Sequence, residues 1–532
     1  MFFGKVSHRK QKSKTVNLFK VNIANYILLL NFRNQTHQVQ IMKYFVTFLV
    51  LCFSVSLSFS QDGKADDFLK KEFHKSRREA LRFKMPSNSV AVFFANPVRN
   101  RANDVDYVYH QNPNFYYLTG YKEPHAVLVV YSEMQTKDGK SYDEQFYVQE
   151  RNPAAEQWTG RRLGVEGAKD DLGFEMVDNG SAFLNSEIDF ASFDKVIFED
   201  FQDDYRNTRN SADLYDLIYA FKTQIKLVDD YKIENKTNDV ELDNTANIKA
   251  ETVKTDTKII STLMAGLREI KTPEELVLLK KAVRISAMGQ REIMKAMHPG
   301  MSETEIQGVH EYIYKTYGSE YEGYPSIVGA GNNGCVLHYV ENSKMKVEND
   351  LVLMDLGAEY HGYTADVTRT IPANGKFNTE QRAIYDIVYK AQEAGIKATV
   401  IGNSMQSPDT AARQVVYQGL IDLGIAKNER EARQYFPHGT SHHIGLDVHD
   451  PGLYGRLEAH MVITVEPGIY IPEGSACDPK WHGIAVRIED DILITANGPV
   501  NLSAEAPRKA QEIEQLMKQK SVLNGLDLPS LD

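Results

Sequence analysis

Short apolar runs alternate with amphipathic stretches between residues 66 and 226. DDFLKKEFHKSRREALRF, residues 66–83, predicts a helix. Four apolar runs predict strands, several of them buried, at 89–95, 126–131, 145–149 and 195–200. Because helices and strands mix, we expect residues 61–228 to form a small α/β domain.

The pattern after residue 258 predicts a second domain, covering 258–517 with a tail at 518–532. Its first long helix should begin at Thr272, with Pro273 in the first turn and Glu275 closing a capping box. Two further amphipathic helices are expected at 382–400 and 410–425, and strands at 350–371, 461–471 and 483–495.

The stretch between the two domains, residues 229–257, is rich in Asn, Asp, Lys and Thr and poor in large apolar residues. Such a segment cannot bury much surface, so it is interpreted as a polar linker or insertion. A length of 532 residues with 42% hydrophobic content fits two globular domains.

Charge is unevenly distributed along the chain, whose net charge is −11. Residues 1–61 contain eight Lys and Arg and no Asp or Glu, so the remainder has 53 basic against 72 acidic residues, a net charge of −19. An acidic body of this kind repels phosphate backbones, which argues against nucleic acid as a partner.

Residues 42–60, MKYFVTFLVLCFSVSLSFS, have the layout of a secretory signal peptide: a lysine, an apolar run, and small residues before Gln61. The unbroken apolar core is shorter than the ~20 residues of a spanning helix, so we expect no stable membrane span in the mature chain. The protein is predicted to be exported, periplasmic or secreted, after cleavage near Gln61. Residues 1–41 are interpreted as a mis-called extension, with Met42 as the true start.

Two motifs invite simple assignments that fail on inspection. GAGNNG, residues 329–334, matches a dinucleotide fingerprint but is followed by the strand-like CVLHYVEN rather than a helix, so we interpret it as a glycine-rich turn. In HGTSHHIGLDVHD, residues 438–450, His438 and His442 stand four apart, but glycine, threonine and serine fill the gap where a zinc helix needs a glutamate.

Four acids interrupt apolar, strand-like runs: Asp355, Asp366, Glu466 and Glu489. Carboxylates are rarely buried unless they are paired or bind a metal, because burial and mutual repulsion oppose their ionisation. We therefore expect a common partner. Two divalent cations would balance the four negative charges, and His442 would complete the set.

The same residues carry a resemblance. MDLGAEYHGYTADVTRT, HGTSHHIGLDVHD, TVEPGIY and GIAVRIEDD resemble the signature blocks of the pita-bread metallopeptidases, and NPNFYYLTGYKEPHAVLVV with WTGRRLG resembles the aminopeptidase P N-terminal domain. The resemblance implies an α+β fold, in which a pita-bread catalytic domain follows a smaller α/β creatinase/aminopeptidase P N-terminal domain.

The resemblance also implies roles for individual residues. Asp355 would bind one metal, Asp366 and Glu489 would bridge both, and His442 and Glu466 would complete the other site. Glu466 would also move the proton, while His338 and His449 would act on the scissile carbonyl or the tetrahedral intermediate. The implied substrate-binding and supporting residues are His438, Tyr324, Trp481, Arg161 and Arg162, with Arg487 paired to a metal-bound carboxylate.

The implied reaction releases the N-terminal residue from peptides with proline in second position, by attack of a metal-bound hydroxide. Mostly oxygen ligands favour a hard ion, so Mn2+ fits best, with cobalt, zinc or iron left open. Family members often form dimers or tetramers, and we expect a homo-oligomer. Two alternatives remain: an Xaa-Pro dipeptidase (prolidase), and a metal-free peptide-binding protein on the same fold.

Overall fold

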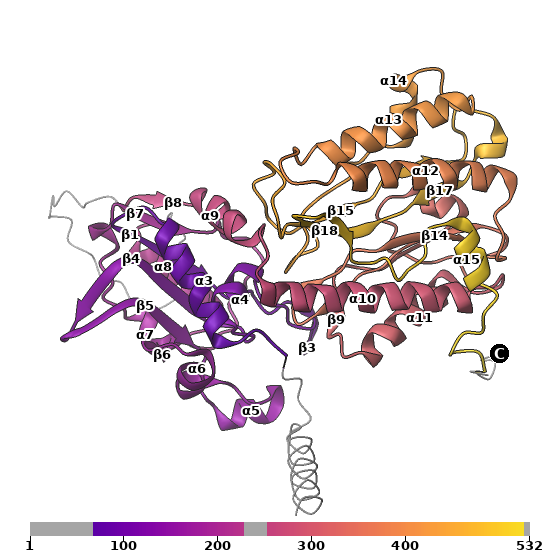
Figure 1. Cartoon of the computed structure of the whole chain (residues 1–532). Helices are drawn as coiled ribbons and strands as arrows, with labels where there is room; N and C mark the ends of the chain where they lie inside the picture. Colours follow the sequence, from indigo (N-terminus) through magenta and orange to yellow (C-terminus); the bar gives the residue numbers. More distant parts are fainter. Residues whose placement is uncertain (1–66, 228–252, 526–532) are drawn as a thin grey trace, which may run out of the picture. The chain divides into compact units, whose positions relative to one another are not determined.

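The computed structural model describes residues 67–227 and 253–525 (Figure 1). The predicted extension (1–41), the signal peptide (42–60) and most of the polar segment 229–257 lie outside these residues. The described residues from Leu69 onward form one compact unit. Within the described part of the chain, no helix is both long and apolar enough to cross a membrane.

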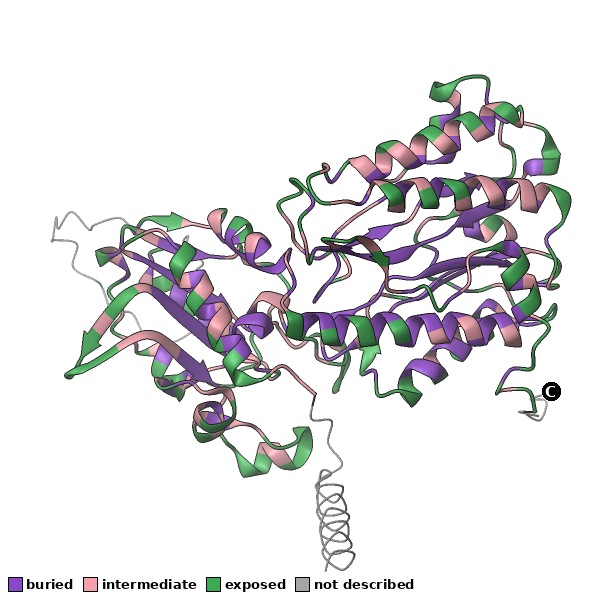
Figure 2. Ribbon diagram, in the orientation of Figure 1, coloured by how far each residue is buried: buried purple, intermediate pink, exposed green. Residues whose placement is uncertain are grey.

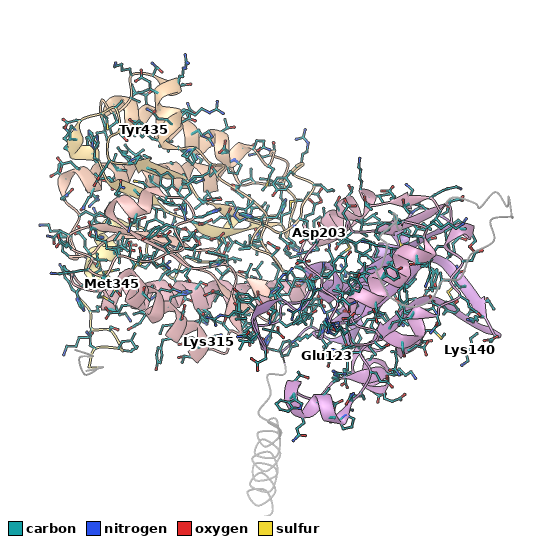
Figure 3. All side chains as sticks on the ribbon, turned by 180° about the vertical axis from the view of Figure 1, so that it is seen from behind. Glu123, Lys140, Asp203, Lys315, Met345 and Tyr435 are labelled. Atoms are coloured by element: carbon teal, nitrogen blue, oxygen red, sulfur yellow. The ribbon has the colours of Figure 1, made fainter. Side chains whose placement is uncertain are left out.

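A six-stranded sheet forms the centre of the N-terminal domain, in the order β6-β5-β4-β1-β7-β8. The β5–β4 and β4–β1 pairs are antiparallel, whereas β6–β5, β1–β7 and β7–β8 are parallel. The strands of this sheet are β1 (Ser89–Phe94), β4 (Val127–Lys137), β5 (Lys140–Val148), β6 (Val177–Asn179), β7 (Lys195–Phe198) and β8 (Thr255–Asp256). Figure 3 shows Lys140 at the end of the β4–β5 hairpin.

Both faces of this sheet are buried, which explains why its strands appear as continuous apolar runs. In β1, Val90 and Val92 belong to one hydrophobic cluster, while Ala91 and Phe93 belong to another. Side chains alternate across a strand, so the two clusters lie on opposite faces. The other elements of this domain are α3 (Lys71–Lys84), β2 (Asn100–Ala102), β3 (Val105–Asp106), α4 (Pro113–Thr119), α5 (Pro153–Thr159), α6 (Gly164–Leu172), α7 (Gly180–Leu184), η1 (Phe190–Ser192), α8 (Leu214–Gln224) and α9 (Ile259–Arg268).

One end of the segment predicted to be a linker belongs to this sheet. Thr255 and Asp256 form β8 and pair with Val196 and Ile197 of β7. Asp256 also accepts a hydrogen bond from Lys195 Nζ at 2.8 Å and from the amides that begin α9. The chain therefore returns to the N-terminal domain before it enters the second domain.

The second domain is built around two long β-hairpins, each broken in the middle. In the first, β11 (Leu351–Asp355) pairs with β14 (Thr368–Pro372), and beyond the break β12 (Ala358–Tyr360) pairs with β13 (Tyr363–Thr364). In the second, β15 (Val462–Val465) pairs with β18 (Asp490–Thr495), and β16 (Gly468–Ile471) pairs with β17 (Ile484–Arg487). The predicted strand run 350–371 thus holds four short strands, and the runs 461–471 and 483–495 hold two each.

Helices lie on both sides of these strands (Figure 1). They are α10 (Pro273–Ala296), α11 (Glu303–Thr316), α12 (Thr379–Ala398), α13 (Ser407–Asp422), α14 (Glu429–Ala432) and α15 (Ala510–Leu516). The capping box predicted at Thr272 and Glu275 is confirmed, and Asn378 with Gln381 forms another at the start of α12. Figure 2 shows these helices buried on the face toward the strands and exposed on the other.

The prediction that CVLHYVEN is strand-like is wrong. Gly331–Cys335 form a short 3-10 helix, η2, and residues 336–342 have no regular structure. Here a side chain takes the place of backbone pairing between strands. The Asn342 side chain accepts a hydrogen bond from the Val328 amide and donates one to the Ser326 carbonyl. The remaining elements are β9 (Tyr321–Glu322), β10 (Ile327–Ala330), η3 (Arg433–Tyr435), η4 (Pro479–Trp481) and β19 (Gly498–Asn501).

Candidate metal centre

Two of the predicted metal ligands lie at the break of the first hairpin. Asp355 is the last residue of β11 and pairs with Thr368, while Asp366 lies between β13 and β14. Both side chains are buried, and the Tyr324 hydroxyl lies 2.6 Å from Asp355 Oδ1 and 2.8 Å from Asp366 Oδ1. The break brings the two carboxylates to one point, although eleven positions separate them.

The other two acids lie at the break of the second hairpin. Glu466 separates β15 from β16, and Glu489 separates β17 from β18. Because Val465 pairs with Asp490 and Gly468 with Arg487, the two glutamates face each other across the hairpin. Pro467 has no backbone N–H and cannot donate a hydrogen bond to a neighbouring strand, which is consistent with the break after Glu466. The Glu489 amide donates to the Thr368 carbonyl at 3.1 Å, which joins the two breaks.

His442 brings the only nitrogen of the predicted ligand set. Its Nε2 lies 3.5 Å from Asp366 Oδ2 and 3.5 Å from Glu466 Oε1. Ligand atoms of Asp366, His442 and Glu489 all lie within 4.8 Å of one another. Its Nδ1 lies 3.0 Å from the His443 carbonyl, to which a proton on Nδ1 can be donated. The lone pair of Nε2 is then available to a metal ion.

The site has too little positive charge for its carboxylates. Burial and then Asp355 raise the pKa of Asp366 well above its usual value, and burial and then Asp366 do the same to the pKa of Glu489. Burial also raises the pKa of Glu466, to about 7. Asp355 differs: burial opposes its ionisation, but Arg487 and Tyr324 outweigh burial and hold its pKa below the usual value.

Arg487 contacts a carboxylate in the way that the sequence predicts. Its NH2 group donates to Asp355 Oδ2 at 2.6 Å, NH1 donates to the Tyr470 hydroxyl at 2.9 Å, and Nε to Thr368 Oγ1 at 3.2 Å. One guanidinium cannot balance four carboxylates. Divalent cations fit this donor set, because they supply the missing charge and prefer these oxygen and imidazole ligands.

Several residues around the carboxylates were not found by sequence reasoning. Thr368 Oγ1 donates to Glu489 Oε2 at 2.6 Å, and Asp491 Oδ2 accepts from the Asp366 amide at 3.1 Å. Each stands two positions after a predicted ligand: Thr368 after Asp366, and Asp491 after Glu489. Side chains two positions apart on a strand lie on the same face. This spacing was the sequence signal that could have pointed to Thr368 and Asp491.

His449, predicted to be catalytic, and His438, predicted to bind substrate, both lie beside the centre but have different surroundings. His449 is exposed, and its ring packs edge-on against His442 with centroids 4.3 Å apart. Burial and then the His442 charge lower the pKa of His449, and His338 contributes to the same shift. His438 Nε2 lies 2.8 Å from the Tyr470 hydroxyl, and burial lowers its pKa to about 4.

The residues predicted to bind substrate do not all lie at this centre. Tyr324 does, but its hydroxyl is bound to carboxylates, a contact the sequence did not suggest. Trp481 is 6% exposed and packs in the hydrophobic cluster that includes Phe436, the ring beside His438. Arg161 and Arg162 line a cavity of the N-terminal domain whose lining includes none of the predicted metal ligands.

Comparisons with known proteins identify the family of the chain. Residues 277–496 match the model of metallopeptidase family M24, and residues 74–188 match the aminopeptidase P N-terminal domain. The Xaa-Pro aminopeptidase of Escherichia coli (strain K12) is 36% identical over 460 residues, covering 84% of this chain and 98% of that protein. The chain belongs to the aminopeptidase P family. Xaa-Pro aminopeptidase 3 of Rattus norvegicus is 32% identical, with 82% of each protein covered.

Solved structures of aminopeptidase P show the same fold. The Escherichia coli enzyme with the inhibitor Pro-Leu has a TM-score of 0.72 and 34% identity, over 85% of this chain and 98% of that chain. A zinc-substituted form of that enzyme in complex with product has a TM-score of 0.71. As an M24 metallopeptidase of the aminopeptidase P family, this protein acts with divalent metal ions.

Proposed function

We propose that this protein is an Xaa-Pro aminopeptidase, which releases the N-terminal residue from peptides with proline in second position. One observation carries the proposal. The four acids and His442 converge where the two hairpins break, in a chain that aligns with 98% of an Xaa-Pro aminopeptidase. We keep the predicted ligand set: Asp355, Asp366, His442, Glu466 and Glu489 would hold the two divalent ions.

The chain's own groups would orient the substrate and move the proton. When bound, the ions supply a water nucleophile at neutral pH and polarise the scissile carbonyl. Glu466, between the hairpin segments, would accept a proton and return it to the leaving nitrogen of proline. His449 and His338 would donate hydrogen bonds to the oxygen of the scissile group as negative charge develops there.

Aromatic side chains would select the proline ring. Proline has a fixed φ and a tertiary amide nitrogen, so a pocket can recognise it by shape. His438 next to Phe436, whose cluster includes Trp481, supports placing that pocket on this side of the centre. The Tyr324 ring would form part of the opposite wall while its hydroxyl holds Asp355 and Asp366.

Three finer assignments belong to this proposal. Mn2+ is the proposed native metal, because the donors are mostly oxygen. Export is proposed from residues 42–60, and N-terminal sequencing of the mature protein tests it: a first residue near Gln61 supports export, and an intact start contradicts it. A dimer or tetramer is proposed as the working form, in which Arg161 and Arg162 would reach a neighbouring subunit's substrate.

The decisive experiment measures metal content and hydrolysis together. Purified protein should contain about two divalent ions per chain, cleave Ala-Pro-Ala, and leave Ala-Ala-Ala intact. A chelator should abolish cleavage, and Mn2+ should restore it.

Other outcomes would favour the alternatives. Cleavage of Ala-Pro but not Ala-Pro-Ala would identify a prolidase. Absence of both bound metal and Mn2+-stimulated cleavage would identify a peptide-binding protein on this fold.

A further inference from the structure

Two fully buried glutamines reach the two hairpin breaks from different helices. Gln290 belongs to α10, which packs against β12 and β13 of the first hairpin, and Gln392 belongs to α12, which packs against β15, β16 and β17 of the second. Figure 1 shows the two helices on opposite sides of the strands. A buried amide group finds its hydrogen-bond partners inside the protein, so these partners show what each glutamine holds in place.

Gln290 joins the two strands of the first hairpin at the break. Its Nε2 group donates to the Met354 carbonyl at 3.0 Å and to the Val367 carbonyl at 2.8 Å. Met354 immediately precedes Asp355, and Val367 immediately follows Asp366. One side chain therefore ties the backbone beside one predicted ligand to the backbone beside the other.

Gln392 makes the corresponding bonds at the second break. Its Nε2 group donates to the Val465 carbonyl at 3.1 Å and to Asp490 Oδ2 at 2.9 Å. Val465 immediately precedes Glu466, and Asp490 immediately follows Glu489. In both hairpins, the bonded residues are thus the one before the first acid and the one after the second.

The acceptors determine which way each amide group points. Carbonyl and carboxylate oxygens accept hydrogen bonds, so the atom that bridges each break must be the nitrogen. The oxygen of Gln392 then accepts from Arg508 NH1 at 2.9 Å, whereas the oxygen of Gln290 is buried without a partner among the described residues. An unsatisfied buried oxygen lowers stability, so stability alone does not explain a glutamine at position 290.

We propose that Gln290 and Gln392 are positioning residues of the metal centre, each holding the two acids of one break at the separation that divalent cations require. The inference rests on the proposed function, because this separation matters only where the carboxylates bind ions. Gln290 acts through the backbone beside the ligands, and Gln392 acts through the backbone and the Asp490 side chain. Residues that orient metal ligands typically contribute about ten- to a hundredfold to metal affinity.

The test removes the donors while keeping the size of each side chain. The full, Mn2+-loaded Gln290→Met and Gln392→Met chains are titrated with a competing chelator, which measures the dissociation constant for Mn2+ without relying on activity. Each variant should bind Mn2+ about ten- to a hundredfold more weakly than the native chain. Gln290→Glu should recover part of the affinity, because a carboxyl buried between two carbonyl oxygens keeps its proton and donates one bond.

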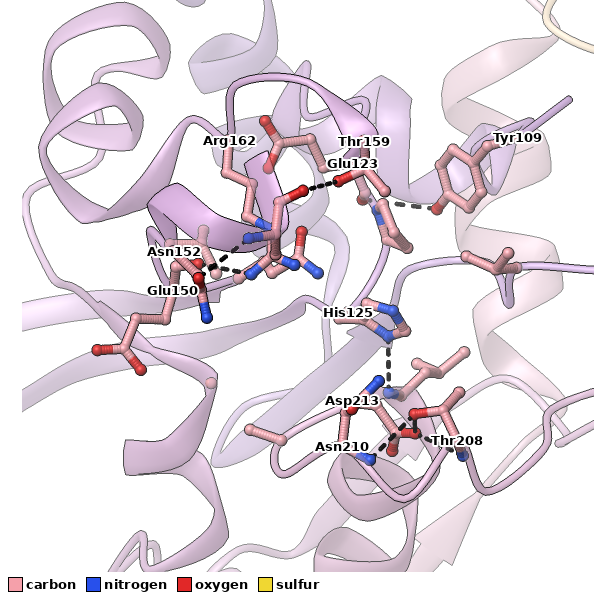
Figure 4. Close-up of a pocket in the computed structure, with 18 of the residues that line it drawn as sticks. Tyr109, Glu123, His125, Glu150, Asn152, Thr159, Arg162, Thr208, Asn210 and Asp213 are labelled. Carbon is pink, nitrogen blue, oxygen red and sulfur yellow. Dashed lines mark hydrogen bonds between the residues drawn. The ribbon is translucent and has the colours of Figure 1, made fainter. Parts of the chain in front are cut away.

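Two controls separate positioning from a general loss of stability. Gln381→Met is the matched control on α12, since this buried glutamine bonds to the backbone of Asn378 and Asn349 and not to a break. Asp213→Ala removes the cap of α8 in the N-terminal domain (Figure 4). Both controls should unfold at a lower urea concentration than the native chain and keep its affinity for Mn2+.

Native Mn2+ affinity in Gln290→Met and Gln392→Met, or an equal loss of affinity in the controls, would overturn the proposal. If methionine unfolds the chain, Gln290→Glu decides: weaker Mn2+ binding than in the native chain supports the proposal, and native affinity overturns it. A native chain that binds no Mn2+ would overturn the proposed function as well, so the two failures are distinguishable.

Discussion

At the scale of single residues, Glu489 offers a direct test of the metal centre. It is 2% exposed, accepts from Thr368 Oγ1, and joins the two hairpin breaks through its amide. Glu489→Gln keeps the volume but removes a charge needed to bind cations. We expect metal content, measured by elemental analysis, to fall below two ions per chain, and kcat/KM for Ala-Pro-Ala to fall more than about a hundredfold.

Glu512→Gln provides the comparison, since Glu512 is an exposed glutamate on α15 paired only with Lys509. It should leave both quantities unchanged. Full metal content and activity in Glu489→Gln would contradict the proposed ligand set.

The buried His310 should make the free energy of unfolding depend on pH, independently of the metal centre. It is 1% exposed, neither ring nitrogen has a hydrogen-bond partner among the described residues, and burial lowers its pKa from 6.5 to about 3. The unfolded chain therefore binds a proton at this residue that the folded chain does not, and stability is lost as pH falls below 6.5. His310→Leu should reduce that loss by up to about 1.4 kcal/mol per pH unit.

Urea unfolding at pH 7 and pH 5 measures the effect, with the exposed His298→Leu as the comparison. At pH 7, His310→Leu should also be at least as stable as the native chain, because it removes two unsatisfied buried nitrogens. An identical pH slope in both variants would show that His310 does not contribute.

That the four acids share one site could be anticipated from the sequence, but the contacts around them could not. Acids within apolar runs are unusual enough to mark Asp355, Asp366, Glu466 and Glu489. The roles of Thr368 and the Tyr324 hydroxyl depend on where the strands break and which side chains then face each other. That information lies in pairing between distant segments, which the local pattern does not contain.

At the scale of elements, the sequence predicted where strands occur but not that they are divided. MVITVEPGIYI is apolar throughout apart from Glu466, so nothing in the run distinguishes one strand from two. The division follows from pairing with β18 on one side of the break and with β17 on the other. Helix starts were more predictable, because a capping box such as Thr272 and Glu275 is a local signal.

The contact between α10 and α11 depends on a glycine. A Cβ atom added at Gly289 would lie 2.3 Å from His310 Cδ2, a clash that the buried ring cannot easily avoid. Gly289→Ala should therefore lower the free energy of unfolding by about 1–3 kcal/mol, although alanine favours a helix.

Gly308 on α11 offers the opposite case in the same helix pair. A Cβ atom there would meet nothing within 4 Å, so Gly308→Ala should raise the free energy of unfolding by about 1 kcal/mol. Thermal or urea unfolding of both variants checks the pair. A stabilising Gly289→Ala would contradict the assigned contact.

At the scale of the whole molecule, a buried ion cluster connects the N-terminal domain with the loop that carries His449. Asp450, next to His449, accepts from Lys271 Nζ at 2.8 Å and from Arg268. Arg268 NH1 donates at 2.7 Å to Asn114 of α4. Lys271 and Asp450 are each 1% exposed, so the cluster is held together without solvent.

Asp450→Asn should remove the carboxylate that Arg268 and Lys271 share, and lower the free energy of unfolding by about 3–5 kcal/mol. Because the His449 loop would lose its attachment, kcat should fall more than KM changes, with metal content retained. Asp478→Asn, an exposed aspartate, is the comparison. Unfolding curves, steady-state kinetics and elemental analysis together separate loss of fold from misplacement of the loop.

The two-domain organisation could be predicted because composition changes sharply around residue 230. The return of the chain to the N-terminal sheet through β8 could not be predicted. Two residues are too few to carry a strand pattern, and their partner strand β7 lies about sixty positions earlier. Tertiary pairing alone gives Thr255 and Asp256 their structure.

The buried carboxylates at the two hairpin breaks also determine what the protein exchanges with its solvent. Without cations, burial and mutual repulsion raise the pKa values of Asp366 and Glu489, so these carboxylates keep protons to a higher pH than free ones do. Uptake of a dication must expel those protons. Adding metal to the apoprotein should therefore acidify a weakly buffered solution. Metal affinity should fall as the pH is lowered, so the pH of the medium should control the fraction of the protein that holds metal.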